Sequence, residues 1–360
     1  MKEKIIDFLI HHAAPSIVLR VKKEILKNLC NNEERELLEK IYLQKNIQTV
    51  IQSQKSDGWF GNAFHGESPK QGAGMYDNME VGLRYLAEKG LSYDNKYIEK
   101  AVNSFLTKDP YDAAYGGKAP QPPATDYTYT ASGLYLARSS IIIRAGYEQR
   151  LPANGFIDLK HDIDYSFNTF VNVLNYENLD NVIDTHKKKL CFKPDVRWPC
   201  LYDLRMLAHS QSWRNERNTS LLADSVNRLF SFPQSNEMVY TYVKGQYVGP
   251  CFAFIYWQMQ VLGVIKDDNL ETAWFDMMEL LARCGAIKQV ALLSNKYDFL
   301  LSLIDDDLEI KNINVNKRKS HGWSPYFGIA LEEDWKEKIR LQCDLLFRVL
   351  LIIHYSECTE

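Results

Sequence analysis

Hydrophobic residues recur along this chain at intervals of three and four, which is the spacing that gives a helix one apolar face. Pro15 is suited to the first turn of a helix, and Val18, Val21, Ile25 and Leu29 follow it on one face. No stretch keeps the alternation of a half-buried strand, and only residues 310–315 are strand-like. Later helices are expected at residues 98–106, 128–145, 165–174, 179–186, 200–209, 220–230, 250–262, 272–284, 290–303 and 332–355.

This succession predicts an all-α protein built from stacked helical hairpins, each of which buries one face against the next. Such an array either stays an open solenoid or closes into an (α/α) toroid. The connecting loops favour closure, because they are long, aromatic and unlike one another, as loops at the mouth of a cavity would be. These loops are residues 57–75, 109–126, 188–199 and 311–325.

We therefore expect a single (α/α) toroid domain over residues 1–360, with about six hairpins around a central cavity. Residues 1–55 would supply the entry helices and residues 56–310 the main hairpins. Residues 311–360 would form the closing loop and the last helix.

Composition limits the partners of this chain. It is 46% hydrophobic and 25% charged, as expected of a globular protein with an ample core. A net charge of −3 gives no global basic field that would recruit nucleic acid. The longest apolar runs, such as residues 345–353, are too short to span a bilayer. We expect no transmembrane segment, and composition leaves the oligomeric state open.

The seven cysteines are scattered, without a Cys-x-x-Cys pair, which suits free thiols in a reducing compartment. The N-terminus carries Glu3 and leads into an amphipathic run, so it is not expected to be a signal peptide. Both observations favour a cytoplasmic location.

The most informative local feature is residues 54–61, which read Gln-Lys-Ser-Asp-Gly-Trp-Phe-Gly. The Asp57-Gly58 pair favours a tight turn, since glycine accepts a positive φ. Gln54 can bond to the backbone at a helix end. Trp59 offers a large flat face that either packs in a core or stacks on a ligand.

This Gln-x-x-Asp-Gly-Trp arrangement resembles the repeat motif of the terpenoid cyclase and protein prenyltransferase superfamily. Residues 15–21 look like the entry helices of bacterial squalene-cyclase-like proteins, and residues 114–117 and 321–323 are weaker echoes of the repeat. The resemblance is specific over about residues 15–90 and diffuse beyond them. It implies an (α/α) toroid whose central cavity binds an isoprenoid or another small apolar ligand, and we expect no cofactor.

Clusters of acids and aromatic rings stand at the starts of several expected inner helices. If those helices run parallel, their starts meet at one end of the cavity and line a pocket. The alternative is that each acid caps its own helix. The candidates for ligand binding in these clusters and in the aromatic loops are Trp59, Tyr76, Asp77, Asp126, Tyr127, Trp257 and Trp323.

Asp162 and Asp164 are the candidate catalytic residues. Class II terpene cyclases carry an Asp-x-Asp-Asp motif whose middle acid protonates an alkene or an epoxide. Residues 162–164 match its first part, but Tyr165 replaces the last acid. Such protonation needs a neutral acid held by its neighbours, and aromatic walls would stabilise the carbocation. A capping or surface role for both residues is the alternative.

Residues 197–214 are dense in polar and aromatic side chains. If they are helical from residue 199, then Tyr202, Arg205, His209 and Trp213 lie near one face, with Trp198 just before them. An arginine beside aromatic rings suits a carboxylate, phosphate or sugar ligand. The alternative is a polar network between helices that includes Asp203.

A metal site is not expected. Cys343 and His354 lie about three turns apart on one expected helix, so they cannot bind the same zinc ion unless that helix breaks. Asp344 and Arg348 are one turn apart and should form a structural pair. Residues 305–307 and the lysines of 187–189 are expected in solvated segments.

Three functions therefore remain open. The first is a terpenoid-cyclase-like protein that binds an apolar small molecule, with acid-initiated cyclisation as its chemistry. The second is a carbohydrate-active α/α toroid, a lyase or a hydrolase with paired carboxylates drawn from Asp77, Glu80, Asp126 and Asp203. The third is a non-catalytic helical scaffold that binds a small molecule or a protein.

Overall fold

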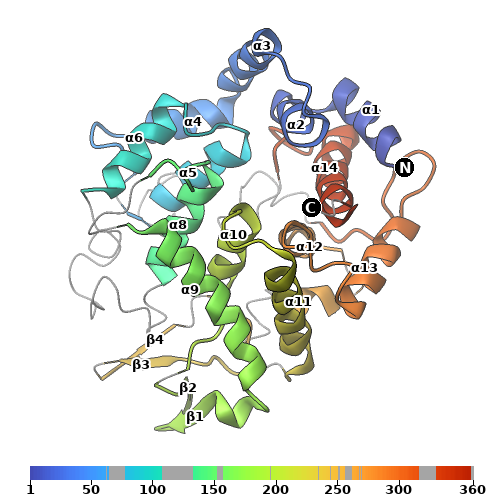
Figure 1. Ribbon diagram of the computed structural model, residues 1–360. Coiled ribbons are helices and arrows are strands. Elements are labelled where there is room, and N and C mark those ends of the chain that lie inside the picture. The colour runs from blue at the N-terminus through green and yellow to red at the C-terminus, as the bar shows by residue number, and fades with distance from the viewer. Residues whose placement is uncertain are drawn as a thin grey trace. The chain divides into compact units, whose positions relative to one another are not determined.

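The computed structural model describes most of the chain, and helices are its main regular element (Figure 1). This confirms the predicted all-α class. The closed toroid and the single domain stay predictions. The described residues are 1–61, 63–64, 78–107, 133–151, 157–194, 196–233, 235–243, 245–249, 252–255, 262–266, 268, 270–315 and 330–357.

Contacts along the chain divide it into two compact units. Unit 1 comprises residues 1–104, 269–282 and 297–360, and unit 2 comprises residues 105–268 and 283–296. Helices α12 (Thr272–Arg283) and α13 (Ala291–Ser302) each contribute residues to both units.

Unit 1 is organised around two helices that are buried along most of their length. All ten residues of α5 (Met79–Glu88) are buried, and α14 (Lys338–Glu357) is buried from Cys343 to Ile353. The first helix packs against α14 (Figure 1). The other helices of unit 1 are α1 (Lys2–His12), α2 (Pro15–Arg20), the π-helix η1 (Val21–Leu26), α3 (Asn31–Tyr42), α4 (Lys45–Ser53) and α6 (Lys96–Phe105).

Unit 2 has a helical part and a β part. Helix α10 (Leu201–His209) packs against α8 (Gly133–Arg144) and α9 (Leu159–Asn172), and α11 (Glu216–Ser231) packs against α9. Short 3-10 turns follow at Val173–Asn175, Leu179–Asn181 and Gly263–Lys266.

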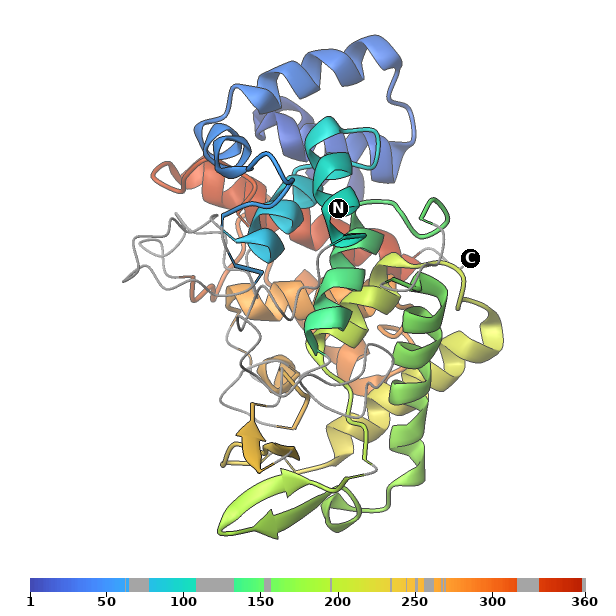
Figure 2. The ribbon, with the colours of Figure 1, turned by 90° about the vertical axis from the view of Figure 1, so that its left-hand side faces the viewer.

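The β part consists of two antiparallel hairpins, visible below the helices of unit 2 in Figure 2. Strands β1 (Ile183–His186) and β2 (Lys189–Phe192) form the first, and β3 (Thr241–Val243) and β4 (Gln246–Val248) form the second. Tyr240 joins them through a parallel bridge to Cys191. The helix expected at residues 179–186 is therefore wrong. A single 3-10 turn gives way there to β-branched Val182, Ile183 and Thr185, which favour a strand.

Other helices agree with the sequence in type and differ at their ends. Helix α10 ends as predicted and begins one residue later, whereas α9 begins six residues earlier because the side chain of Asp158 caps it. The strand-like residues 310–315 form only isolated bridges, at Ile310 and Ile313. The last helix begins at Lys338 rather than 332, and residues 330–335 instead pack against it.

Candidate functional site

The motif at residues 54–61 ties the end of α4 to the first turns of α6. The side-chain amide of Gln54 donates to the carbonyl oxygens of Gly58 (3.0 Å) and Tyr97 (2.8 Å). Asp57 accepts from the backbone N–H of Trp59 at 3.1 Å. The Trp59 ring is fully buried and meets the Phe64 ring edge-on. Here the motif joins two helices, and a ligand contact by Trp59 stays a prediction.

Gly58 is required where the motif passes α6. Its φ is +95°, and an added Cβ would lie 2.4 Å from the carbonyl oxygen of Lys100. We expect Gly58→Ala to lower the free energy of unfolding by about 2–4 kcal/mol, measured by urea denaturation. Gly245→Ala is the matched control, because its φ is +84° but nothing lies within 4 Å of the added Cβ. A cost no larger than that of the control would contradict the proposed clash.

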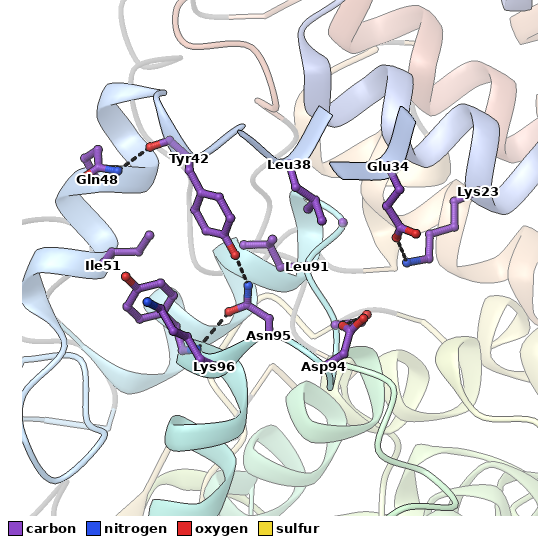
Figure 3. Close-up of a pocket in the computed structure, with 13 residues that line it drawn as sticks. Lys23, Glu34, Leu38, Tyr42, Gln48, Ile51, Leu91, Asp94, Asn95 and Lys96 are labelled. Atoms are coloured by element: carbon purple, nitrogen blue, oxygen red, sulfur yellow. Dashed lines mark hydrogen bonds and ion pairs between the residues drawn. The ribbon is translucent and has the colours of Figure 1, made fainter. Parts of the chain in front are cut away.

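Beside this junction, unit 1 carries an open groove with a volume of about 490 Å³ (Figure 3). Leu38 of α3, Ile51 of α4 and Leu91 after α5 give it apolar surface. Two tyrosine rings, Tyr42 and Tyr97, lie with their centroids 6.5 Å apart at an angle of 59°. Because Gln54 bonds to the backbone of Tyr97, the motif positions one wall of this groove.

Polar groups hold the groove in shape. Asn95 donates its side-chain amide to the Tyr42 hydroxyl, and its oxygen accepts from the backbone N–H of Tyr97 at 3.0 Å (Figure 3). The Asn95 side chain thus both caps α6 and holds the Tyr42 ring in place. Partial burial raises the pKa of Tyr42, so the phenol stays neutral.

Charges of both signs stand around the groove. Lys23 pairs with Glu34 at 2.7 Å, and Lys23 belongs to the π-helix η1, a rare conformation that is frequent at functional sites. Asp94 and Lys96 are exposed in the segment that enters α6. A lining that combines apolar side chains, two rings and charged groups suits a small amphiphilic molecule. Gln54 is the one residue singled out in the sequence that leads to this groove, through its bond to Tyr97.

The two candidate catalytic acids point to different faces of α9. Asp162 is fully buried and accepts from the Ser139 hydroxyl of α8 at 2.5 Å, with His161 Nδ1 at 3.5 Å. Asp164 is exposed. Side chains two positions apart on a helix differ by about 200° in direction, so these two carboxylates do not converge. A proton-donor role for either one stays a prediction.

The expected stripe of residues 198–213 is split. Tyr202 and Arg205 are buried on α10, and His209 ends that helix half-buried. Trp213 lies beyond the helix, where its indole N–H donates to the Leu207 carbonyl at 2.9 Å. Trp198 is 8% exposed and packs edge-on against Phe232, with the ring centroids 5.2 Å apart. These side chains lie in the core of unit 2 rather than on one open face.

Asp203 is a second buried acid of unit 2. It accepts from the Ser166 hydroxyl of α9 and from the backbone N–H of Cys200, each at 2.9 Å, and so caps α10. Burial raises its pKa, against the opposing field of Arg197. Arg197 stacks on the Tyr165 ring, with its guanidinium carbon 3.5 Å from the centroid. This matches the alternative in which Asp203 belongs to a network between helices.

Six of the expected ligand-binding residues lie outside the part of the chain that the structure describes. They are Tyr76, Asp77, Asp126, Tyr127, Trp257 and Trp323.

Unit 1 contains a buried ion network between α2, α5, α12 and α14. Arg348 contacts Glu279 at 2.6 Å and Glu88 at 3.5 Å, and Arg20 contacts Glu88 at 3.1 Å. Arg20 also pairs with Glu24 of η1 at 2.6 Å. Burial lowers the pKa of Arg348, but the carboxylates of Glu279 and Glu88 outweigh it and raise the pKa.

The expected pairing of Asp344 with Arg348 is wrong. Asp344 instead accepts from the backbone N–H of Leu331 at 2.6 Å and from the Trp335 indole N–H at 2.5 Å. Glu332 accepts from the backbone N–H of Ala14 at 2.6 Å. Asp344 therefore anchors residues 331–335 to α14.

Burial shifts the ionisable groups of this anchor toward neutrality. It raises the pKa of Asp344 to about 6 and that of Glu332 to about 7. It lowers the pKa of Lys89 to about 8, and this ammonium group donates to Gln44 at 3.1 Å and to the Leu331 carbonyl.

Within the described ranges, no three His, Cys, Asp or Glu side chains lie close enough together to hold a metal ion. No helix among these residues combines the length and the apolar character needed to cross a bilayer. No family model matches the chain, and neither the curated proteins nor the solved structures that were compared include a match.

Proposed function

We propose that this chain is a terpenoid-cyclase-like helical protein that binds an isoprenoid or another small, largely apolar molecule. The observation that carries the proposal is the groove between α3, α4 and the start of α6. Its volume of about 490 Å³ is within the range of small-molecule sites, and Leu38, Ile51 and Leu91 make part of its lining apolar.

The proposal joins this groove to the motif at residues 54–61. Gln54 supports the wall that carries Tyr97, so the sequence feature that suggested the protein class also shapes the site. The (α/α) toroid with its central cavity and the cytoplasmic location belong to the same proposal. Acid-initiated cyclisation would use Asp162 or Asp164 alone, because the two carboxylates lie on different faces of α9.

A titration with farnesol, an isoprenoid alcohol, tests the proposal by calorimetry. Ile51→Asp and Leu38→Asp place a charge on the apolar surface of the groove, at positions that are only half-buried. We expect each variant to lower the affinity at least about tenfold, because a desolvated carboxylate opposes an apolar ligand. Leu43→Asp is the matched control, since Leu43 is 82% exposed and does not line the groove.

The outcomes separate the three functions. Farnesol binding that Ile51→Asp and Leu38→Asp leave unchanged would contradict the groove assignment. Wild-type protein that binds a cello-oligosaccharide but not farnesol would favour the carbohydrate-active alternative. A protein that binds neither probe would favour the scaffold.

A further inference from the structure

The two hairpins of unit 2 place several aromatic rings together. Tyr240 forms two backbone hydrogen bonds with β2, one on each side of Cys191. The Phe192 N–H donates to the Tyr240 oxygen and the Tyr240 N–H donates to the Leu190 oxygen, each at 2.8 Å. Figures 1 and 2 both show the two hairpins next to one another. In the β3–β4 register Tyr242 lies opposite Tyr247, and Tyr240 shares the face of Tyr242 because alternate strand residues do.

The rings are in mutual contact and are fixed by hydrogen bonds. Tyr247 lies 5.7 Å from Tyr240 and 5.1 Å from Tyr242 between centroids. The His186 ring lies 4.0 Å from the Tyr242 ring. The Tyr247 hydroxyl lies 3.0 Å from His186 Nδ1 and donates to the His186 carbonyl at 3.1 Å. The cluster is therefore organised before any ligand arrives.

A cation already occupies this cluster. The Lys189 ammonium lies 4.4 Å from the centroid of Tyr247 and 4.8 Å from that of Tyr240. Among the described residues no carboxylate forms an ion pair with Lys189, although its side chain is exposed. The negative faces of the two rings are thus its specific neighbours.

The backbone accepts strain to put Lys189 there. Lys187 and Lys188 form the two-residue turn between β1 and β2, with φ of +46° and +69°. A two-residue turn of this kind favours Asn-Gly, because those residues adopt the left-handed conformation easily. For other residues, such as lysine, the left-handed conformation costs about 1 kcal/mol each. The turn fixes the pairing of His186 with Lys189, which places the ammonium group against the rings. Strain that persists in this way is found at functional sites.

We propose that Tyr240, Tyr242, Tyr247 and His186 form an aromatic cage for a small molecule with a quaternary ammonium group of the choline type. Lys189 occupies this cage in the free protein and leaves it when the ligand binds. A quaternary ammonium group competes well because it combines positive charge with apolar methyl groups and sheds water more readily than a lysine.

Calorimetric titration with choline chloride tests the cage. Lys189→Met removes the internal competitor but keeps an unbranched side chain, so we expect it to bind choline about tenfold more tightly than the wild type. Lys188→Met makes the same change one residue earlier, and we expect wild-type affinity. The uncharged isostere 3,3-dimethyl-1-butanol should not bind either variant, because the rings select charge.

The rings are tested in the Lys189→Met protein. Tyr247→Leu should lower its affinity for choline at least about tenfold. Tyr242→Leu is a second ring variant, at a side chain that is 37% exposed and so tolerates truncation. Equal choline affinity in the wild type and in Lys189→Met would overturn the proposal. Binding of 3,3-dimethyl-1-butanol as tight as that of choline would also overturn it. Choline affinity that both ring variants leave unchanged would also overturn it.

Discussion

Replacing Arg348 with alanine is expected to lower the free energy of unfolding by about 3–5 kcal/mol. Arg348 is 1% exposed and lies between Glu279 and Glu88, which are themselves buried. Its removal leaves both carboxylates in a poorly solvating environment with less positive charge to balance them. The loss therefore reflects the cost of uncompensated buried charge and not the net value of the ion pairs.

Arg340→Ala provides the matched control on the same helix. Arg340 pairs with Asp334 at 3.4 Å and with Glu337 at 3.5 Å, but its side chain is 33% exposed. Water compensates for such a loss, so the expected cost is below about 1 kcal/mol. Urea denaturation followed by circular dichroism compares the two variants. Similar midpoints for Arg348→Ala and Arg340→Ala would contradict the role given to the buried network.

Replacing Asp344 with alanine is expected to cost roughly 3 kcal/mol at pH 5. The carboxyl oxygens accept hydrogen bonds from the backbone N–H groups of Leu331 and Glu332 and from the Trp335 indole. The substitution leaves all of these buried donors without their acceptor, which lowers the free energy of unfolding. Residues 331–335 should then separate from α14, which limited proteolysis and tryptophan fluorescence would detect.

The cost of Asp344→Ala should shrink as the pH rises. Burial raises the pKa of Asp344 to about 6 from an ordinary value near 4, so between these values the native protein binds more protons than the unfolded chain. The stability that Asp344 contributes is therefore full below about pH 4 and is lost as the pH rises from there through about 6. The alanine variant has no titrating group at this position, so its free energy of unfolding lacks this pH dependence.

Asp334→Ala is the control for both parts of this prediction. Asp334 is half-buried and accepts from the Lys336 backbone N–H at 3.0 Å. Its removal should cost below about 1 kcal/mol. A cost for Asp344→Ala that increases between pH 4 and 7 would contradict the assigned shift.

Helix positions could be predicted from the sequence wherever an apolar face was regular. The helix at α10 was predicted to within a residue, because Cys200 and Asp203 enclose its start and a regular apolar pattern follows. The β1–β2 hairpin was missed because the turn is formed by two lysines rather than by Asn-Gly. A pair of lysines alone indicates a solvated segment. The strand becomes apparent only when the preceding β-branched residues, Ile183 and Thr185, are considered together with the pair.

The candidate site was harder to predict because burial depends on tertiary packing. Gln54 was identified as a backbone-bonding residue, and the structure confirms that contact. Asp162 and Asp164 look equivalent in the sequence, yet one is buried and the other exposed, because two residues cover more than half a helical turn. Tyr42 and Tyr97 are separated by the whole of α4 and α5, so nothing local links them.

The ion network of unit 1 bears on how the protein is made. Arg20 and Glu88 are synthesised before Arg348, which follows Glu88 by about 260 residues. At typical ribosomal rates of about 5–20 residues per second, the early charges wait roughly 10–50 seconds for that partner. During this interval Glu88 has Arg20 as a partner but lacks the Arg348 guanidinium. Folding of unit 1 should therefore finish only after α14 has emerged from the ribosome.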